Sequence, residues 1–176
     1  MRYLKTEEII VNDINILIDG NISISNYFSN RMRANQTIDS SYILDKNLMG
    51  LSNTAIRTSS IILKKISEEV IAFDWFFFSC CLLNGKTAKF INEASTFYRQ
   101  YEDNLVGLGK TSHKSFEFSL KVKSNNYYNL MKIDDSYASL YKENEKIREK
   151  FLRIDKSHVK DLKIKFPFWW EATHSV

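Results

Sequence analysis

The stretch that decides the fold class is Ile14-Asn-Ile-Leu-Ile-Asp-Gly-Asn-Ile-Ser-Ile24. Isoleucines alternate with other residues on both sides of Asp19-Gly20, and this dipeptide between two alternating runs is a strong hairpin signal. A loop of Asp19, Gly20 and Asn21 predicts two facing pairs across the hairpin, Ile16 with Ile24 and Ile18 with Ile22.

The same region also fits a helix. Residues 7–18 could form an amphipathic helix that Thr6 caps and Gly20 ends, with Ile10, Ile14 and Leu17 on one face. Isoleucine favours the strand because β-branched residues pack well on a pleated surface. The sequence leaves the choice between helix and strand open.

Two other segments alternate apolar and polar residues and are therefore predicted strands. The first is Ser115–Lys123, with its apolar side chains at every second position. The second is Asp161–Phe168, where Pro167 removes one backbone donor. A proline of this kind fits only an edge strand.

Three long segments repeat apolar residues every three or four positions, which predicts amphipathic helices. The first runs from Ser52 or Asn53 to Asn84, where Gly85 would end it, and the second begins at Thr87 and extends to about Leu108. The third runs from Tyr137 to about Lys156, with Asp135 as its cap.

The apolar run Val70–Leu83 lies inside the first of these helices. It carries Asp74 and spans about 14 residues, whereas a membrane-spanning helix needs roughly 20. Because it is apolar on nearly every side, we predict a central buried helix with the following core residues: Trp75, Phe76, Phe77 and Leu82.

These segments together predict an α+β fold with three long amphipathic helices on a small, mainly antiparallel sheet. An all-α bundle is the alternative. The chain has 176 residues, one proline and five glycines, which leaves no composition typical of a linker. We therefore predict a single globular domain over residues 1–176.

Charge argues against a typical nucleic-acid binder, and the N-terminus predicts a cytoplasmic protein. The 25 basic and 21 acidic residues give a net charge of +4, a mixed surface without the concentrated basic field of a typical nucleic-acid binder. The N-terminus carries charges where a signal peptide needs an apolar core. No membrane partner is expected.

Neither a cofactor nor a metal ion is expected. Gly85-Lys86-Thr87 and Gly109-Lys110-Thr111 both lack the first glycine of a phosphate-binding loop. The three histidines and the adjacent pair Cys80-Cys81 show no zinc-binding spacing. A serine nucleophile motif is also absent, so the sequence favours a protein without a reaction centre.

One segment offers candidate catalytic residues. Arg153-Ile-Asp-Lys-Ser-His158 resembles the arginine-to-histidine motif of HEPN-family nucleases, helical-bundle proteins that cleave RNA without a metal ion, usually as dimers. The resemblance implies that His158 would transfer a proton and that Arg153 would stabilise charge on the phosphate. A metal-independent RNase, with a homodimer as its assembly, is therefore an alternative function.

The C-terminal region offers candidate partner-binding residues. Phe168, Trp169 and Trp170 follow an alternating segment that carries Lys163 and Lys165. Aromatic side chains are enriched at binding hot spots, and lysines beside them can also follow a nucleic-acid backbone. Binding of nucleic acid without catalysis is thus another alternative.

The function that the sequence favours is binding of another protein by surface complementarity. An inhibitor, an immunity protein or an adaptor would have this character, and the asparagine- and lysine-rich composition suggests a low-GC or mobile-element gene. This hypothesis depends on the absence of a strong catalytic motif and on an aromatic content of 14%.

Overall fold

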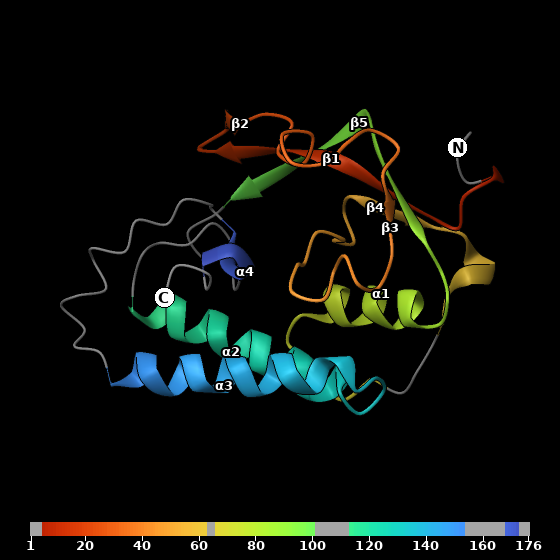
Figure 1. The fold of residues 1–176 in the computed structure, drawn as a ribbon. Helices are drawn as coiled ribbons and strands as arrows, with labels where there is room; N and C mark the ends of the chain where they lie inside the picture. The colour runs from red at the N-terminus through yellow and green to blue at the C-terminus, as the bar shows by residue number, and fades with distance from the viewer. Residues whose placement is uncertain (1–4, 63–65, 101–112, 154–167, 173–176) are drawn as a thin grey trace. The chain divides into compact units, whose positions relative to one another are not determined.

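The computed structural model describes residues 5–62, 66–100, 113–153 and 168–172 (Figure 1). These residues form a mixed five-stranded sheet and three helices of more than ten residues. The predicted α+β class is therefore confirmed, and the all-α alternative is wrong.

The chain divides into two compact units. The first contains residues 1–65 and 74–103, and the second contains residues 66–73 and 104–176. The single domain expected over residues 1–176 stays a prediction.

Strand β1 (Ile9–Ile18) organises the first unit, and most of its residues are buried. It pairs antiparallel with β2 (Asn21–Ile24) and β4 (Thr54–Ile56), and parallel with β5 (Ala88–Gln100). The short β3 (Thr37–Ile38) pairs antiparallel with the start of β5. Strand β2 is thus an edge of the described sheet.

The predicted hairpin is confirmed, and the helix over residues 7–18 is wrong. Asp19 and Gly20 form a two-residue turn with φ of 50° and 78°, the positive-φ region that such tight hairpins require. Ile16 faces Ile24 as predicted, but Ile22 faces Leu17 because the turn is one residue shorter than expected and a bulge follows Ile16.

Strand β4 replaces the start of one predicted helix, and strand β5 replaces another. Residues 54–56 pair with the start of β1, and the helix expected from residue 52 or 53 is shortened to α1 (Phe73–Leu83). The segment after Thr87 forms β5 because it pairs with all of β1, with a break in register after Ile91. Pairing with a distant strand has overridden the local three-and-four spacing.

The end of α1 agrees with the prediction, and three of its four predicted core residues are buried. Gly85 has φ of 78°, its N–H bonds the Leu82 carbonyl, and the N–H of Lys86 bonds the Cys81 carbonyl, which is the Schellman arrangement. Trp75, Phe76 and Leu82 are buried, whereas Phe77 is partly exposed. No described helix is both long and apolar enough to cross a membrane.

The second unit is built on α2 (His113–Leu130) and α3 (Ser136–Leu152), which lie side by side (Figure 1). Phe116 and Leu120 of α2 pack with Phe151 of α3, and Ile147 covers them. The strand predicted over residues 115–123 is therefore wrong. Residues 116 and 120 lie one helical turn apart and meet one partner, which a strand with the same alternation could not achieve.

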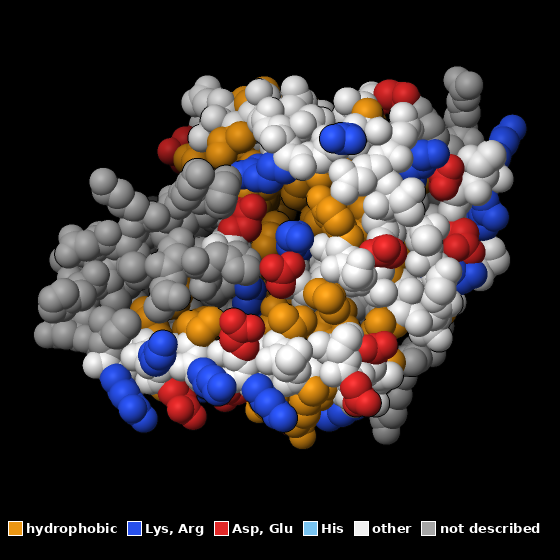
Figure 2. Space-filling model, viewed as in Figure 1, with side chains coloured by type: hydrophobic (Ala, Val, Ile, Leu, Met, Phe, Trp, Pro, Cys, Tyr) orange, Lys and Arg blue, Asp and Glu red, His pale blue; other side chains and the backbone are white. Residues whose placement is uncertain are grey.

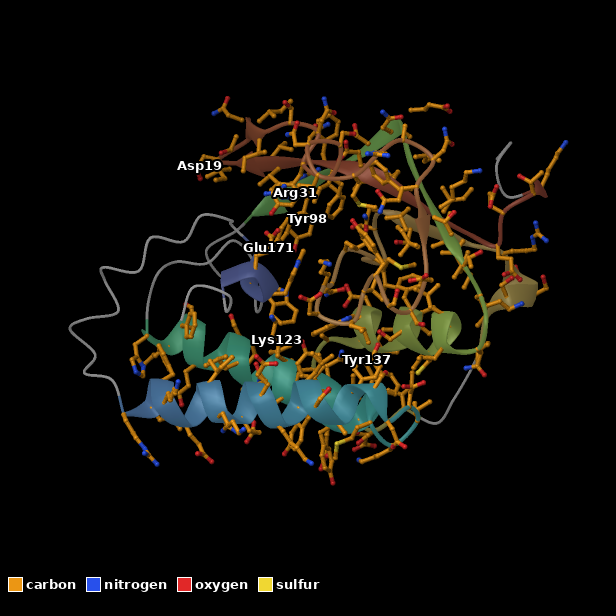
Figure 3. The ribbon with its side chains drawn as sticks, in the orientation of Figure 1. Asp19, Arg31, Tyr98, Lys123, Tyr137 and Glu171 are labelled. Carbon is orange, nitrogen blue, oxygen red and sulfur yellow. The ribbon has the colours of Figure 1, made fainter. Side chains whose placement is uncertain are left out.

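The third predicted helix is confirmed within the described residues, with a different cap. Asp134 accepts the N–H of Ser136 at 2.9 Å, while Asp135 makes no capping bond. Tyr137 and Phe151 of this helix are buried. A last short helix, α4 (Trp169–Ala172), packs against α2; Figure 3 shows Glu171 extending from α4 and the buried Lys123 extending from α2.

Candidate functional site

Asp74 stands apart electrostatically from the other carboxylic acids whose pKa is shifted. Burial raises the pKa of Asp74 above its ordinary value of 3.8. Hydrogen bonds from Lys86, Ser41 and Ser136 instead lower the pKa of three other acids, respectively Glu8, Asp39 and Asp134. A carboxyl whose charged form is disfavoured is a functional-site candidate when its geometry also supports chemistry.

The two oxygens of Asp74 have different surroundings. Oδ1 accepts the backbone N–H of Trp75 at 2.8 Å and the side-chain amide Nδ2 of Asn47 at 3.2 Å. No described residue donates a hydrogen bond to Oδ2. One oxygen is therefore fixed by the protein, while the other has its acceptor capacity available.

The loop that carries Asn47 is anchored to the sheet by Asn53. The Asn53 amide accepts the Gly50 N–H at 2.8 Å and donates to the carbonyls of Leu48 and Asn12 at 3.1 and 3.2 Å. In return, the Asn12 N–H bonds the Asn53 carbonyl at 2.9 Å. Asn47 thus projects from a segment that is tied to β1.

Gly50 lies beside Oδ2 of Asp74. A Cβ atom at this position would lie 3.7 Å from Oδ2 of Asp74 and 3.0 Å from Oδ1 of Asn53. The second distance is tighter than an ordinary contact, so a larger residue would have to displace the anchoring amide.

A second acceptor lies beside Asp74. Oδ1 of Asn47 is buried and has no hydrogen-bond partner among the described residues. A buried acceptor without a donor is costly. Because this oxygen is buried, the acceptor left for a substrate hydroxyl or amine is Oδ2 of Asp74.

The predicted catalytic pair is described only in part. Arg153 is exposed at the C-terminal end of α3, and His158 lies outside the described residues. The nuclease alternative therefore stays a prediction. Likewise, no group of three His, Cys, Asp or Glu that could hold a metal ion occurs within the described ranges.

The predicted partner-binding aromatics are buried. Phe168, Trp169 and Trp170 expose only 2%, 4% and 6% of their surface. The rings of Phe168 and Trp170 stack at 4.2 Å, and the two tryptophans meet edge to face. Lys163 and Lys165 lie outside the described residues. The binding role of this region stays a prediction, but the described rings lie against their own chain.

The outer face of α3 carries both signs of charge. Figure 2 shows basic and acidic side chains interspersed along this helix, and its exposed residues include Lys142, Glu143, Lys146, Glu149 and Lys150. A mixed face of this kind is typical of a solvated helix and not of a phosphate-binding stripe.

The comparisons with known proteins found no relative. No protein-family model matches the chain, and neither the curated proteins nor the solved structures gave a match. The support for the Asp74 site is therefore its own hydrogen bonds and burial. The sequence signal for it was a single acid near the start of an otherwise apolar helix.

Proposed function

We propose that the chain is an enzyme in which Asp74 acts as a general base toward a hydroxyl or amino group of its substrate. The observation that supports this is the asymmetry of the carboxyl group, with Oδ1 fixed by two donors and Oδ2 unbound by any described residue. A general base must first be positioned and then have a suitable pKa. Burial raises the pKa of Asp74, which makes its carboxylate a stronger base than an exposed aspartate.

The chemistry follows from the acceptor capacity of Oδ2 of Asp74. A substrate hydroxyl or amine that donates to Oδ2 of Asp74 would become more nucleophilic as its proton moves to the carboxylate. This proposal departs from the non-catalytic function expected from sequence because it depends on side chains that only the fold brings together.

Asp74→Asn is expected to abolish substrate conversion while preserving the fold. The protein would be incubated with a cellular small-molecule extract, and consumed and formed compounds would be followed by mass spectrometry. General-base catalysis typically contributes about 10²–10⁴-fold, so conversion should fall by about that factor. Asp45→Asn, in the same loop as Asn47, is the control and should behave as the wild type. Equal conversion by wild type and Asp74→Asn would refute the proposal.

The same variant should be more stable than the wild type at neutral pH. Because the folded-state pKa is raised, the native protein binds more protons than the unfolded chain between the two pKa values, and its stability falls as pH rises through that window. The uncharged amide of Asp74→Asn would remove this loss, and the gain should vanish below the ordinary pKa of 3.8. Urea denaturation of both proteins at neutral pH and below pH 3.8 measures this difference in stability.

A protein-interaction module is the second candidate, and the exposed end of the sheet supports it. Ile18, Ile22 and Phe97 expose 42%, 56% and 58% of their surface, although all three are large and apolar. Ile22 lies on the edge strand β2. An inhibitor, immunity protein or adaptor could use such residues as anchors.

The double variant Ile22→Ser with Phe97→Ser tests this second candidate. Affinity purification from the native host should recover a stoichiometric protein with the wild type and lose it with the double variant, because hot-spot residues carry most binding energy. Leu51→Ser, at a side chain exposed by 64% elsewhere in the same unit, is the control. The same recovered proteins in all three samples would count against this surface.

A further inference from the structure

Asn47 contacts Asp74 through one defined bond. Its Nδ2 donates to Oδ1 of Asp74 at 3.2 Å, and the two residues are 27 positions apart in the chain. The bond favours the charged carboxylate and so opposes the effect of burial on the Asp74 pKa. Asn47 thus acts on both the orientation and the proton affinity of the acid.

The support for Asn47 extends to β1 and to α1. Asn53 bonds three backbone groups, of which two belong to the loop and one to β1. Trp75, the residue after Asp74, donates its indole N–H to the Ile43 carbonyl at 3.0 Å. The segment from Ile43 to Asn53 is therefore tied both to β1 and to α1, which carries Asp74.

No neighbouring charge is needed to explain the state of Asp74. The pKa of Asp74 is raised by burial and lowered by the Trp75 N–H and the Asn47 amide. The charged groups of the loop are engaged with each other or with an aromatic ring: Lys46 lies 3.5 Å from Asp45 and over the ring of Tyr42. Within the described residues, Asn47 is thus the side chain that tunes this acid.

We propose that Asn47 is a positioning residue, which holds Oδ1 of Asp74 so that Oδ2 is presented to the substrate. This inference rests on the proposed function of Asp74 as a base. It assigns the loop around Asn47 a role in setting the geometry and the working pH of the site.

The test is an NMR titration of the Asp74 carboxyl carbon in the full chain. In Asn47→Ala the titration midpoint should rise, because a hydrogen bond to the charged form is lost. In Asn47→Asp, which keeps the side-chain shape, it should rise further because a like charge is added. Asn92→Ala, at an exposed asparagine of the same unit, should leave the midpoint unchanged.

The two proposals fail in different ways. A wild-type midpoint in folded Asn47→Ala and Asn47→Asp would overturn the positioning role, whatever the activity of Asp74→Asn. A shifted midpoint together with full substrate conversion by Asp74→Asn would overturn the catalytic role of Asp74. With both roles intact, the pH profile of conversion should move with the titration midpoint.

Discussion

Replacing Trp75 with alanine is expected to lower the free energy of unfolding by about 3–5 kcal/mol, the usual cost of truncating a buried aromatic side chain. Trp75 exposes only 1% of its surface, and its indole donates to the Ile43 carbonyl at 3.0 Å. The variant therefore loses apolar packing, leaves a cavity and removes one hydrogen bond to the Ile43 carbonyl. Urea denaturation followed by circular dichroism measures the change.

Two variants separate these contributions. Trp75→Phe keeps most of the apolar area and removes one of two donors to the Ile43 carbonyl, which still accepts the Lys46 N–H at 3.3 Å. It should therefore cost about 0.5–1.5 kcal/mol, the usual net contribution of one hydrogen bond. Phe77→Ala changes an only partly buried ring of the same helix and should cost less than Trp75→Ala. Equal losses for Trp75→Ala and Phe77→Ala would show that α1 is not buried on the side assigned to it.

The elements predicted correctly from sequence are those that local chemistry determines. The hairpin at Asp19-Gly20 needs only residues that adopt positive φ between two apolar runs, and the end of α1 needs only Gly85. The α3 helix likewise carries its own cap and apolar face. Such signals lie within a few residues of one another and can be recognised without a partner.

The elements predicted wrongly depend on distant partners. Residues 88–100 have apolar side chains at helical spacing, but they form β5 because their backbone pairs with β1 from Ile9 to Ile18. Residues 54–56 become β4 for the same reason. Conversely, the segment with Phe116 and Leu120 is a helix because both side chains pack against Phe151 of α3. Tertiary contacts decide such segments, and a local period cannot reveal them.

The Asp74 site was missed because its parts are distant in sequence. The sequence showed Asp74 only as a charge that interrupts an apolar run. The sequence suggests Asn53 as a helix cap. In the structure Asn53 instead bonds the Asn12 carbonyl of β1, and Asn47 donates to Asp74. Asparagine gives no periodic signal, so its role becomes visible only when its hydrogen-bond partners are known.

Asp13→Ala is expected to destabilise the first unit by about 2–6 kcal/mol, because it would leave two buried backbone donors unbound at about 1–3 kcal/mol each. Asp13 is 1% exposed, and its Oδ1 accepts the N–H groups of Ile14 and Phe28, both at 2.8 Å. Its Oδ2 accepts the N–H of Ser29 at 3.2 Å. The carboxylate therefore replaces backbone pairing where residues 26–29 meet β1.

Asp13→Asn and Asp135→Ala complete this experiment. Asp13→Asn retains one acceptor oxygen but presents an amide to the donors of Ser29. Its stability should therefore lie between those of the wild type and Asp13→Ala. Asp135 is exposed and makes no capping bond, so its alanine variant should stay within about 0.5 kcal/mol of wild type. If Asp13→Ala were as stable as Asp135→Ala, residues 26–29 would not be held by this carboxylate. The acids Asp13 and Asp74 of the first unit thus have opposite effects: Asp13 stabilises the fold through satisfied donors, whereas Asp74 lowers stability at neutral pH through a charge that burial disfavours.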